Sequence, residues 1–457
     1  MNVRIKYLLI GLAVLGLAYP GIAWLIGLRA EALMHKREQQ ALDQFPGNIA
    51  LISRQYHRGV FSSTEELTFG LGPTVLRVLG PLATTSDLGA LHVTVHNSIY
   101  HGPLPQFRSF GLATVSTQVQ LPPELSVKLR ELVGNVPVIR IQSRLGWMGS
   151  SRWQIVSSDY QGRLADGTEI NWRGVDATLS ANANLSASSL DGNIASFTIK
   201  SPKLQVELAG LHCRADWQRV FEVLYTGPLT VKVASMNWQS LPDGTQAHMQ
   251  GLAINGRASV DGDNYKSEGE YGVESIQLAG TSITHAGFAA SLEHLHGPTL
   301  AAMFKDMRAA QLDAGTTTIE HSAAVLATMK KNGIELLLRE PVLRISRIGF
   351  AMPEGELRFS ATVSAPGLTR EELEGSALQA ALVQHLDVVA DLRVDAALVT
   401  RLLADNPKHE ALSQQIEAFE RQGYIKRDGA ALTTHLAFSG GKLIVNGLTY
   451  PPAAGAN

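Results

Sequence analysis

The sequence has almost no cysteine and no excess of basic residues, the features typical of disulfide-bonded, cysteine-rich metal-binding and nucleic-acid-binding proteins. Cys213 is the only cysteine among 457 residues, which excludes an intramolecular disulfide and a cysteine-rich metal site. We expect this thiol to be buried and inert. The 39 Lys and Arg residues are balanced by 41 Asp and Glu, for a net charge of -2, so the clustered basic excess of a nucleic-acid-binding protein is missing.

The local motifs of the common enzyme classes are also missing. The sequence contains no G-x-S-x-G elbow, no H-E-x-x-H, no P-loop and no G-x-G-x-x-G. The one S-x-x-K match, Ser439 to Lys442, encloses Gly440-Gly441 and is predicted to be a hairpin tip. We therefore predict no catalytic, cofactor-binding or metal-binding residues and no enzyme activity.

Histidine is the one potential ligand that is frequent, with 14 residues. His92 and His96 are four apart on a predicted strand, which puts them roughly 13 Å apart on one face, too far to share an ion unaided. We predict that these two and the nearby His101 are solvated on a polar face. His294 and His296 lack a visible third ligand.

The chain begins with one long run without charge. Lys6 and Arg29 bracket Tyr7–Leu28, and a helix of this length spans the roughly 30 Å hydrocarbon core of a bilayer. We predict a single-pass anchor at residues 1–28. Arg4 and Lys6 precede the run, which favours a cytoplasmic N-terminus, with the bulk of the chain in the periplasm.

The alternative to an anchor is a cleaved signal peptide, with Gly21-Ile22-Ala23 as the cleavage site. Cleavage there would cut inside the apolar run, which continues to Leu28. The anchor is therefore the preferred interpretation, and both place the bulk of the chain outside the cytoplasm.

The remainder is expected to form a helical stalk over 29–45 and a β-rich region over 46–457, with a possible subdivision near residue 290. Apolar and polar residues alternate through much of 46–457, as in 91–99, 229–234 and 357–363. This period of two indicates antiparallel sheets with one dry and one wet face.

Tight turns are predicted wherever a dipeptide that adopts positive φ separates two apolar runs. Five of these are Asp-Gly pairs, at 166–167, 191–192, 243–244, 261–262 and 428–429, and two more candidates are Asn332-Gly333 and Gly440-Gly441. Asp261–Asn264 resembles the start of a calcium loop. Because Lys266 and Gly272 replace its glycine and glutamate, we interpret it as a turn.

Helices are expected mainly between residues 299 and 423. Thr369 to Glu372 forms a capping-box pattern, Asn406-Pro407 can begin a second helix, and Pro122-Pro123 a short earlier one. The predicted fold class is α+β, mainly antiparallel β, with helices concentrated in the C-terminal third.

Four stretches in family order resemble the YdgA-like family, a domain of unknown function from Gram-negative envelopes. They are Tyr56–Ser63, Tyr100–Pro105, Pro341–Gly355, and Gly423–Ile425 followed by Gly441–Gly447. The resemblance implies one N-terminal span and a large exported domain. It implies no activity and no site residues.

Two classes of function remain open from the sequence. The chain is either a non-enzymatic envelope protein that binds or conveys a lipid or another apolar component, or a hydrolase of envelope polymers with carboxylates from separate strands. A scaffold protein is a third possibility. No cofactor is expected, inner-membrane lipid is the expected partner, and the oligomeric state is open.

Overall fold

The computed structural model describes residues 3–44, 49–71, 92–107, 110–122, 126–127, 139–164, 166–313, 332–375, 378–404 and 406–450. The chain divides into two compact units, Met1–Pro202 and Lys203–Asn457. Residue 290, near which a subdivision was expected, lies inside a strand. Most of the helix predicted after Pro122 lies outside the described residues.

The N-terminal unit consists of one long helix, α1 (Val3–Gln44), and an antiparallel sheet. Its strands are β1 (Ile49–Arg58), β2 (Ser62–Leu71), β3 (His92–His101), β4 (Ala113–Gln120), β5 (Ile139–Leu145), β6 (Ser151–Ser157), β7 (Tyr160–Arg163), β8 (Glu169–Ala181) and β9 (Ala187–Lys200). Consecutive strands pair from β1 to β6, and β8 pairs with β6, β7 and β9. A short helical turn, η3 (Pro105–Phe107), lies between β3 and β4.

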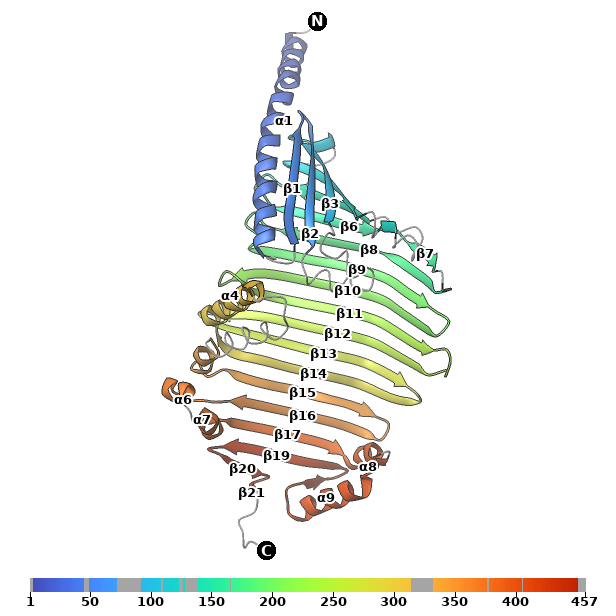
Figure 1. Ribbon diagram of the computed structural model, residues 1–457, viewed down its shortest axis with the longest axis vertical. Helices are drawn as coiled ribbons and strands as arrows, with labels where there is room; N and C mark the ends of the chain where they lie inside the picture. The colour runs from blue at the N-terminus through green and yellow to red at the C-terminus, as the bar shows by residue number, and fades with distance from the viewer. Residues whose placement is uncertain are drawn as a thin grey trace. The chain divides into compact units, whose positions relative to one another are not determined.

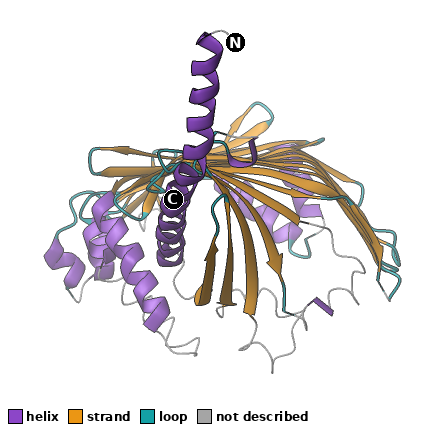
Figure 2. Cartoon of the chain, turned by 90° about the horizontal axis from the view of Figure 1, so that it is seen from above, coloured by secondary structure: helices purple, strands orange, loops and turns teal. Residues whose placement is uncertain are grey.

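Helix α1 packs along the first strands of this sheet (Figures 1 and 2). Ile26 and Ala30 join a buried cluster with Ile99 and Leu112, and Leu33 packs against it. The helix predicted over 29–45 is thus confirmed to Gln44, but it contacts the sheet and is not a free stalk.

Within the described part of the chain, no helix is long and apolar enough to cross a membrane. The side chains of residues 3–17 lie outside the described residues. The span predicted at Tyr7–Leu28 is helical, but its role as an anchor is not confirmed.

The C-terminal unit is an antiparallel meander with helices at the ends of its strands. The strands are β10 (Leu204–Val220), β11 (Leu224–Ser240), β12 (Gln246–Asp261), β13 (Asn264–Leu278), β14 (Thr281–His296), β15 (Val342–Met352), β16 (Gly355–Ser364), β17 (Asp387–Asp395), β18 (Lys426–Asp428), β19 (Ala431–Ser439), β20 (Lys442–Val445) and β21 (Leu448–Tyr450). The helices are α4 (Gly297–Asp313), α6 (Arg370–Glu374), α7 (Leu378–His385), α8 (Ala396–Ala404) and α9 (His409–Arg421).

Each strand from β10 to β17 pairs with the next, and β19 pairs with β17, β18 and β20. Helices α4, α6 and α7 lie at one end of the strands, and α8 and α9 lie at the other (Figure 1). The mainly antiparallel β fold is therefore confirmed. The expected concentration of helices toward the C-terminus is confirmed only in part, because α1 is the longest helix.

Most of the turns predicted from the sequence are found at the predicted positions. Gly167, Gly244, Gly262 and Gly429 all have positive φ next to a hairpin, as do Gly440 and Gly441. The prediction at Asp191-Gly192 is wrong: this pair lies inside β9, opposite Thr178 and Ala177. The turn forms earlier, where Asn182 Oδ1 accepts the Ser186 and Ala187 N–H groups at 2.9 and 3.1 Å.

Two predicted helix starts are found in the structure, and one predicted turn is helical instead. The Thr369 capping box is confirmed at the start of α6. Helix α9 begins at His409, shortly after the Asn406-Pro407 signal. Asn332-Gly333 was predicted to be a turn but belongs to a helical stretch over 332–337, and the Asn332 amide donates to Asp306 at 3.2 Å.

Candidate functional site

A row of apolar side chains crosses eight strands of the C-terminal unit in direct register. Each residue is paired with the next across one strand-to-strand step, so all eight lie on one face. The row is Cys213, Val231, Ile254, Tyr271, Phe288, Ile348, Phe359 and Leu392. It ends at Thr434 of β19. At about 4.8 Å per step, the row is roughly 34 Å long.

Two further rows run parallel to it on the same face. The neighbouring row has mostly small residues: Gly256, Gly269, Ala290, Ile345, Ala361 and Ala390. Beyond it lies another row of larger residues: Leu292, Leu343, Val363, Val388 and Phe438. Small residues between two rows of large ones make a shallow trough, which we call the apolar trough, running across the strands.

The first row is incompletely covered in the described structure. None of its eight side chains is buried, and Tyr271 and Phe288 remain 50% and 38% exposed. The centroids of these two rings are 6.2 Å apart. The sequence left open whether this face is a closed core or an open groove, and these exposures favour a groove.

The buried clusters of this unit lie at the two ends of the strands, on either side of the trough. At one end, Leu300 of α4 packs with Leu224 and Leu295. At the other end, Leu398 of α8 packs with Val394 and Leu432. The described helices therefore cover the margins of the apolar face and leave the first row between them partly exposed.

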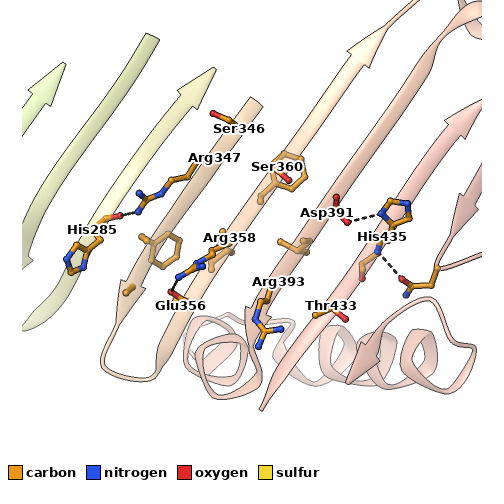
Figure 3. A pocket seen from close by; sticks show the side chains of 17 residues that line it. His285, Ser346, Arg347, Glu356, Arg358, Ser360, Asp391, Arg393, Thr433 and His435 are labelled. Carbon is orange, nitrogen blue, oxygen red and sulfur yellow. Dashed lines mark hydrogen bonds and ion pairs between the residues drawn. The ribbon is translucent and has the colours of Figure 1, made fainter. Parts of the chain in front are cut away.

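The opposite, polar face carries a hollow of about 860 Å³. Figure 3 shows Arg347, Arg358 and Arg393 on neighbouring strands and His435 beside Asp391. The His435 ring nitrogen is 2.8 Å from the Asp391 carboxylate.

The arginines of this hollow already have partners. Arg358 donates to Glu356 at 2.9 Å, and Arg393 to Asp428 at 2.6 Å. Arg347 donates to the His285 carbonyl at 2.9 Å. The charges of Arg358 and Arg393 are therefore compensated, whereas the partner of Arg347 is a neutral backbone carbonyl.

The carboxylates of the hollow do not fit a glycosidase pair. Register places Ser360 opposite Asp391, so Glu356 lies four residues further along β16. This offset is roughly 13 Å along the strand, whereas paired catalytic carboxyl groups are about 5–9.5 Å apart.

A second polar cluster is buried beneath α1 in the N-terminal unit. The Glu65 carboxylate is fully buried and ion-paired with Arg54 at 2.7 Å. It also accepts from the Asn97 amide at 3.0 Å, and Asn97 accepts from the Thr117 hydroxyl at 2.7 Å. Glu38 of α1 lies 3.4 Å from the Arg54 guanidinium. The cluster therefore links α1 to four neighbouring strands, β1 to β4.

This cluster predicts a specific pH dependence. Burial, followed by the negative charge of Glu65, raises the pKa of Glu38 from 4.5 to about 8. The folded unit therefore holds a proton that the unfolded chain releases above pH 4.5, and stability falls as pH rises through this window. We expect the melting temperature of the N-terminal unit to decrease between pH 6.5 and 8, and Glu38→Gln to remove most of that decrease.

The pH window and the variant isolate this effect. Burial lowers the pKa of His101, so its contribution is lost only below pH 6.5 and opposes that of Glu38 there. Above pH 6.5 the slope belongs mainly to Glu38 in this unit. Equal slopes for Glu38→Gln and the unmodified protein would contradict the assignment.

The structure corrects one histidine prediction. His92 is exposed and His96 contacts Gln120 and Glu66 at the surface, as expected. His101 is instead only 2% exposed, within 3.0 Å of the Ser63 hydroxyl and the Ala23 carbonyl. His101 lies on the same side of β3 as the buried Ile99. The alternation of the strand therefore could have predicted that His101 is buried.

The other single residues are placed as follows. Cys213 is half-buried in the first row of the trough, where we expected full burial. His294 is exposed, and His296 bonds to Thr299 at 2.8 Å. Asp261 pairs with Asn264, and Ser439 with Lys442, across the predicted tight turns. Among the described residues, no three His, Cys, Asp or Glu side chains cluster as metal ligands.

Comparison with known proteins gives one match. A family model described as a bacterial protein of unknown function (DUF945) matches residues 4–453. No curated protein and no solved structure matches the chain.

Proposed function

The chain belongs to a bacterial family of unknown function (DUF945), and we propose that it is a lipid-binding protein of the cell envelope. An acyl chain lies in the apolar trough, and the uncharged run Tyr7–Leu28 anchors the protein in the inner membrane with both compact units in the periplasm. We also propose that the chain is related to the YdgA-like proteins of Gram-negative envelopes.

The continuous register of the trough carries this proposal. Exposed apolar surface costs about 25 cal/mol per Å² relative to burial, and large uncovered apolar patches mark binding surfaces. Half of a bilayer core is roughly 15 Å thick, which approximates the length of one acyl chain. The first row is roughly 34 Å long and therefore accommodates such a chain lying across the strands. A row of polar side chains would not bind an acyl chain in this way.

The floor of the trough offers a direct test. A Cβ added at Gly256 or Gly269 meets no atom closer than 3.7 Å, and neither residue has positive φ. Gly256→Leu together with Gly269→Leu should therefore fill the trough without disturbing the strands. We expect phospholipid binding to weaken about tenfold, equivalent to about 1.4 kcal/mol. Native mass spectrometry and titration with a fluorescent phospholipid measure this on the full chain in detergent.

The same two strands supply a matched control on the polar face. Ala253 and Gly272 pair directly with each other, and a Cβ at Gly272 meets nothing within 4 Å. Ala253→Leu with Gly272→Leu should leave lipid binding unchanged. Equal lipid binding by both double variants and the unmodified chain would rule out the trough as the site.

The alternative of an envelope hydrolase has weaker support. Glu356 and Asp391 lie on neighbouring strands and are offset by roughly 13 Å along them. Glu38 and Glu65 are closer together, but they lie beneath α1 on either side of Arg54. A scaffold would bind protein through this face and carry no lipid, which the same mass spectra distinguish.

A further inference from the structure

A second apolar surface lies where α1 leaves the sheet of the N-terminal unit. Here α1 presents two faces. Ala23, Ile26 and Gly27 pack toward the sheet, and a Cβ at Gly27 would lie 2.6 Å from the His101 ring. Ile22, Trp24 and Leu25 point away and are 44%, 45% and 60% exposed. Residues 22–27, near the end of the uncharged run, thus contact the sheet on one side and the surroundings on the other.

Two loops converge on the same part of α1. Tyr19 stacks on Phe61 of the β1–β2 turn at 5.8 Å. Its hydroxyl reaches the Leu104 carbonyl of the β3–β4 loop at 3.5 Å. Both loops carry exposed apolar side chains, because Val60 is 45%, Phe61 49% and Phe110 82% exposed.

Charged residues follow immediately beyond this apolar surface. Arg29 is exposed one turn after Leu25, and Arg58, two residues before Val60, is ion-paired with Glu31. One helical turn is about 5.4 Å and two strand residues about 6.6 Å. Apolar side chains with an exposed cation, Arg29, one helical turn behind them match the acyl and phosphate layers of a bilayer surface, where Trp is also enriched.

We propose that Ile22, Trp24, Leu25, Val60, Phe61 and Phe110 form a membrane-contact rim that inserts into the bilayer interface. The partner is a phospholipid bilayer, and the rim lies where Phe61 stacks on Tyr19 of α1. Figure 1 shows α1 extending past the sheet of its unit toward the N-terminus. The inference rests on the proposed anchor but not on the trough. The two hairpin loops, and not the helix alone, hold this unit against the membrane.

Site-directed labelling of the full chain tests the rim. Single cysteines at Phe61→Cys and Phe110→Cys, in a Cys213→Ser background, carry an environment-sensitive NBD label. The protein is reconstituted into vesicles of phosphatidylethanolamine and phosphatidylglycerol. We expect blue-shifted emission and at least about threefold stronger quenching by headgroup-level nitroxide lipid than by aqueous iodide.

Ile139→Cys is the matched control because Ile139 is 57% exposed but lies at the start of β5. Leu145, at the other end of β5, packs with Ile26 and Ala30 of α1, and the six residues between the two ends of the strand span roughly 20 Å. This label should remain in water. Val60→Cys replaces either rim variant that unfolds, as judged by circular dichroism.

The outcomes separate the rim from the anchor. Flotation of the protein with vesicles, together with labels at 61 and 110 as iodide-accessible as the one at 139, would overturn the rim alone. Failure to float would overturn both the anchor and the rim. Loss of phospholipid binding in the trough variants bears on neither.

Discussion

Replacing Glu65 with Ala should lower the free energy of unfolding of the N-terminal unit by about 3 kcal/mol. The change leaves the Arg54 cation, whose side chain is 20% exposed, without its closest partner and removes the acceptor of the Asn97 amide. Breaking a buried ion pair costs about 3–5 kcal/mol. The lower end applies because Glu38 remains 3.4 Å from Arg54 and its pKa falls once the negative charge of Glu65 is removed, which favours its ionised form as a new counter-ion.

The neighbouring acid provides the control. Glu66 points to the opposite face of β2, where its exposed carboxylate lies 3.4 Å from His96. Because exposed pairs contribute about 0–1 kcal/mol, Glu66→Ala should change stability little. Chemical denaturation, with hydrogen exchange of β1–β4 peptides to locate the effect, measures both variants. Similar losses for the two would refute the buried pairing of Glu65.

Leu398→Ala should destabilise the C-terminal unit by about 2–5 kcal/mol, whereas Phe359→Ala should cost only roughly 1–2 kcal/mol. Leu398 is fully buried in the cluster beneath α8, so its truncation adds a cavity to the lost transfer energy. Phe359 is larger but only half-buried in the first row of the trough, so less of its burial energy is at stake.

The comparison of these two variants tests the openness of the trough without any ligand. Thermal and denaturant unfolding of the lipid-free protein in detergent give both values. If Phe359→Ala costs 3–5 kcal/mol, the face is a closed core. If both losses are small, α8 does not form a packed margin.

The elements themselves were largely predictable. Alternation at 229–234 and 357–363 predicted strands with one apolar face, and β11 and β16 are such strands. The Asp-Gly pairs that end in Gly167, Gly244, Gly262 and Gly429 form the predicted turns between two paired strands. Asp191-Gly192 failed because the Asn182 side chain organises a turn nearer the start of the strand, leaving the dipeptide to pair within the sheet.

The candidate site was predictable only in part. Alternation placed Leu229, Val231 and Val233 on one side of a strand. It did not predict the register, that is, which residues of the neighbouring strands pair with them. The trough requires Gly256 opposite Gly269 and Gly269 opposite Ala290. These pairings depend on the lengths of successive hairpins and on a register shift between Ile345 and Ile348.

The sequence by itself determined the strand-forming segments, most of their turns and the apolar side of each strand, because these depend on neighbours within a few residues. Tertiary structure decided that α8 covers Val394 and leaves Phe288 accessible. It also decided that Glu65, an ordinary acid in a strand, is buried against Arg54 beneath α1. Covering a face and pairing a charge are contacts between distant segments, and their free energies depend on packing that no local pattern specifies.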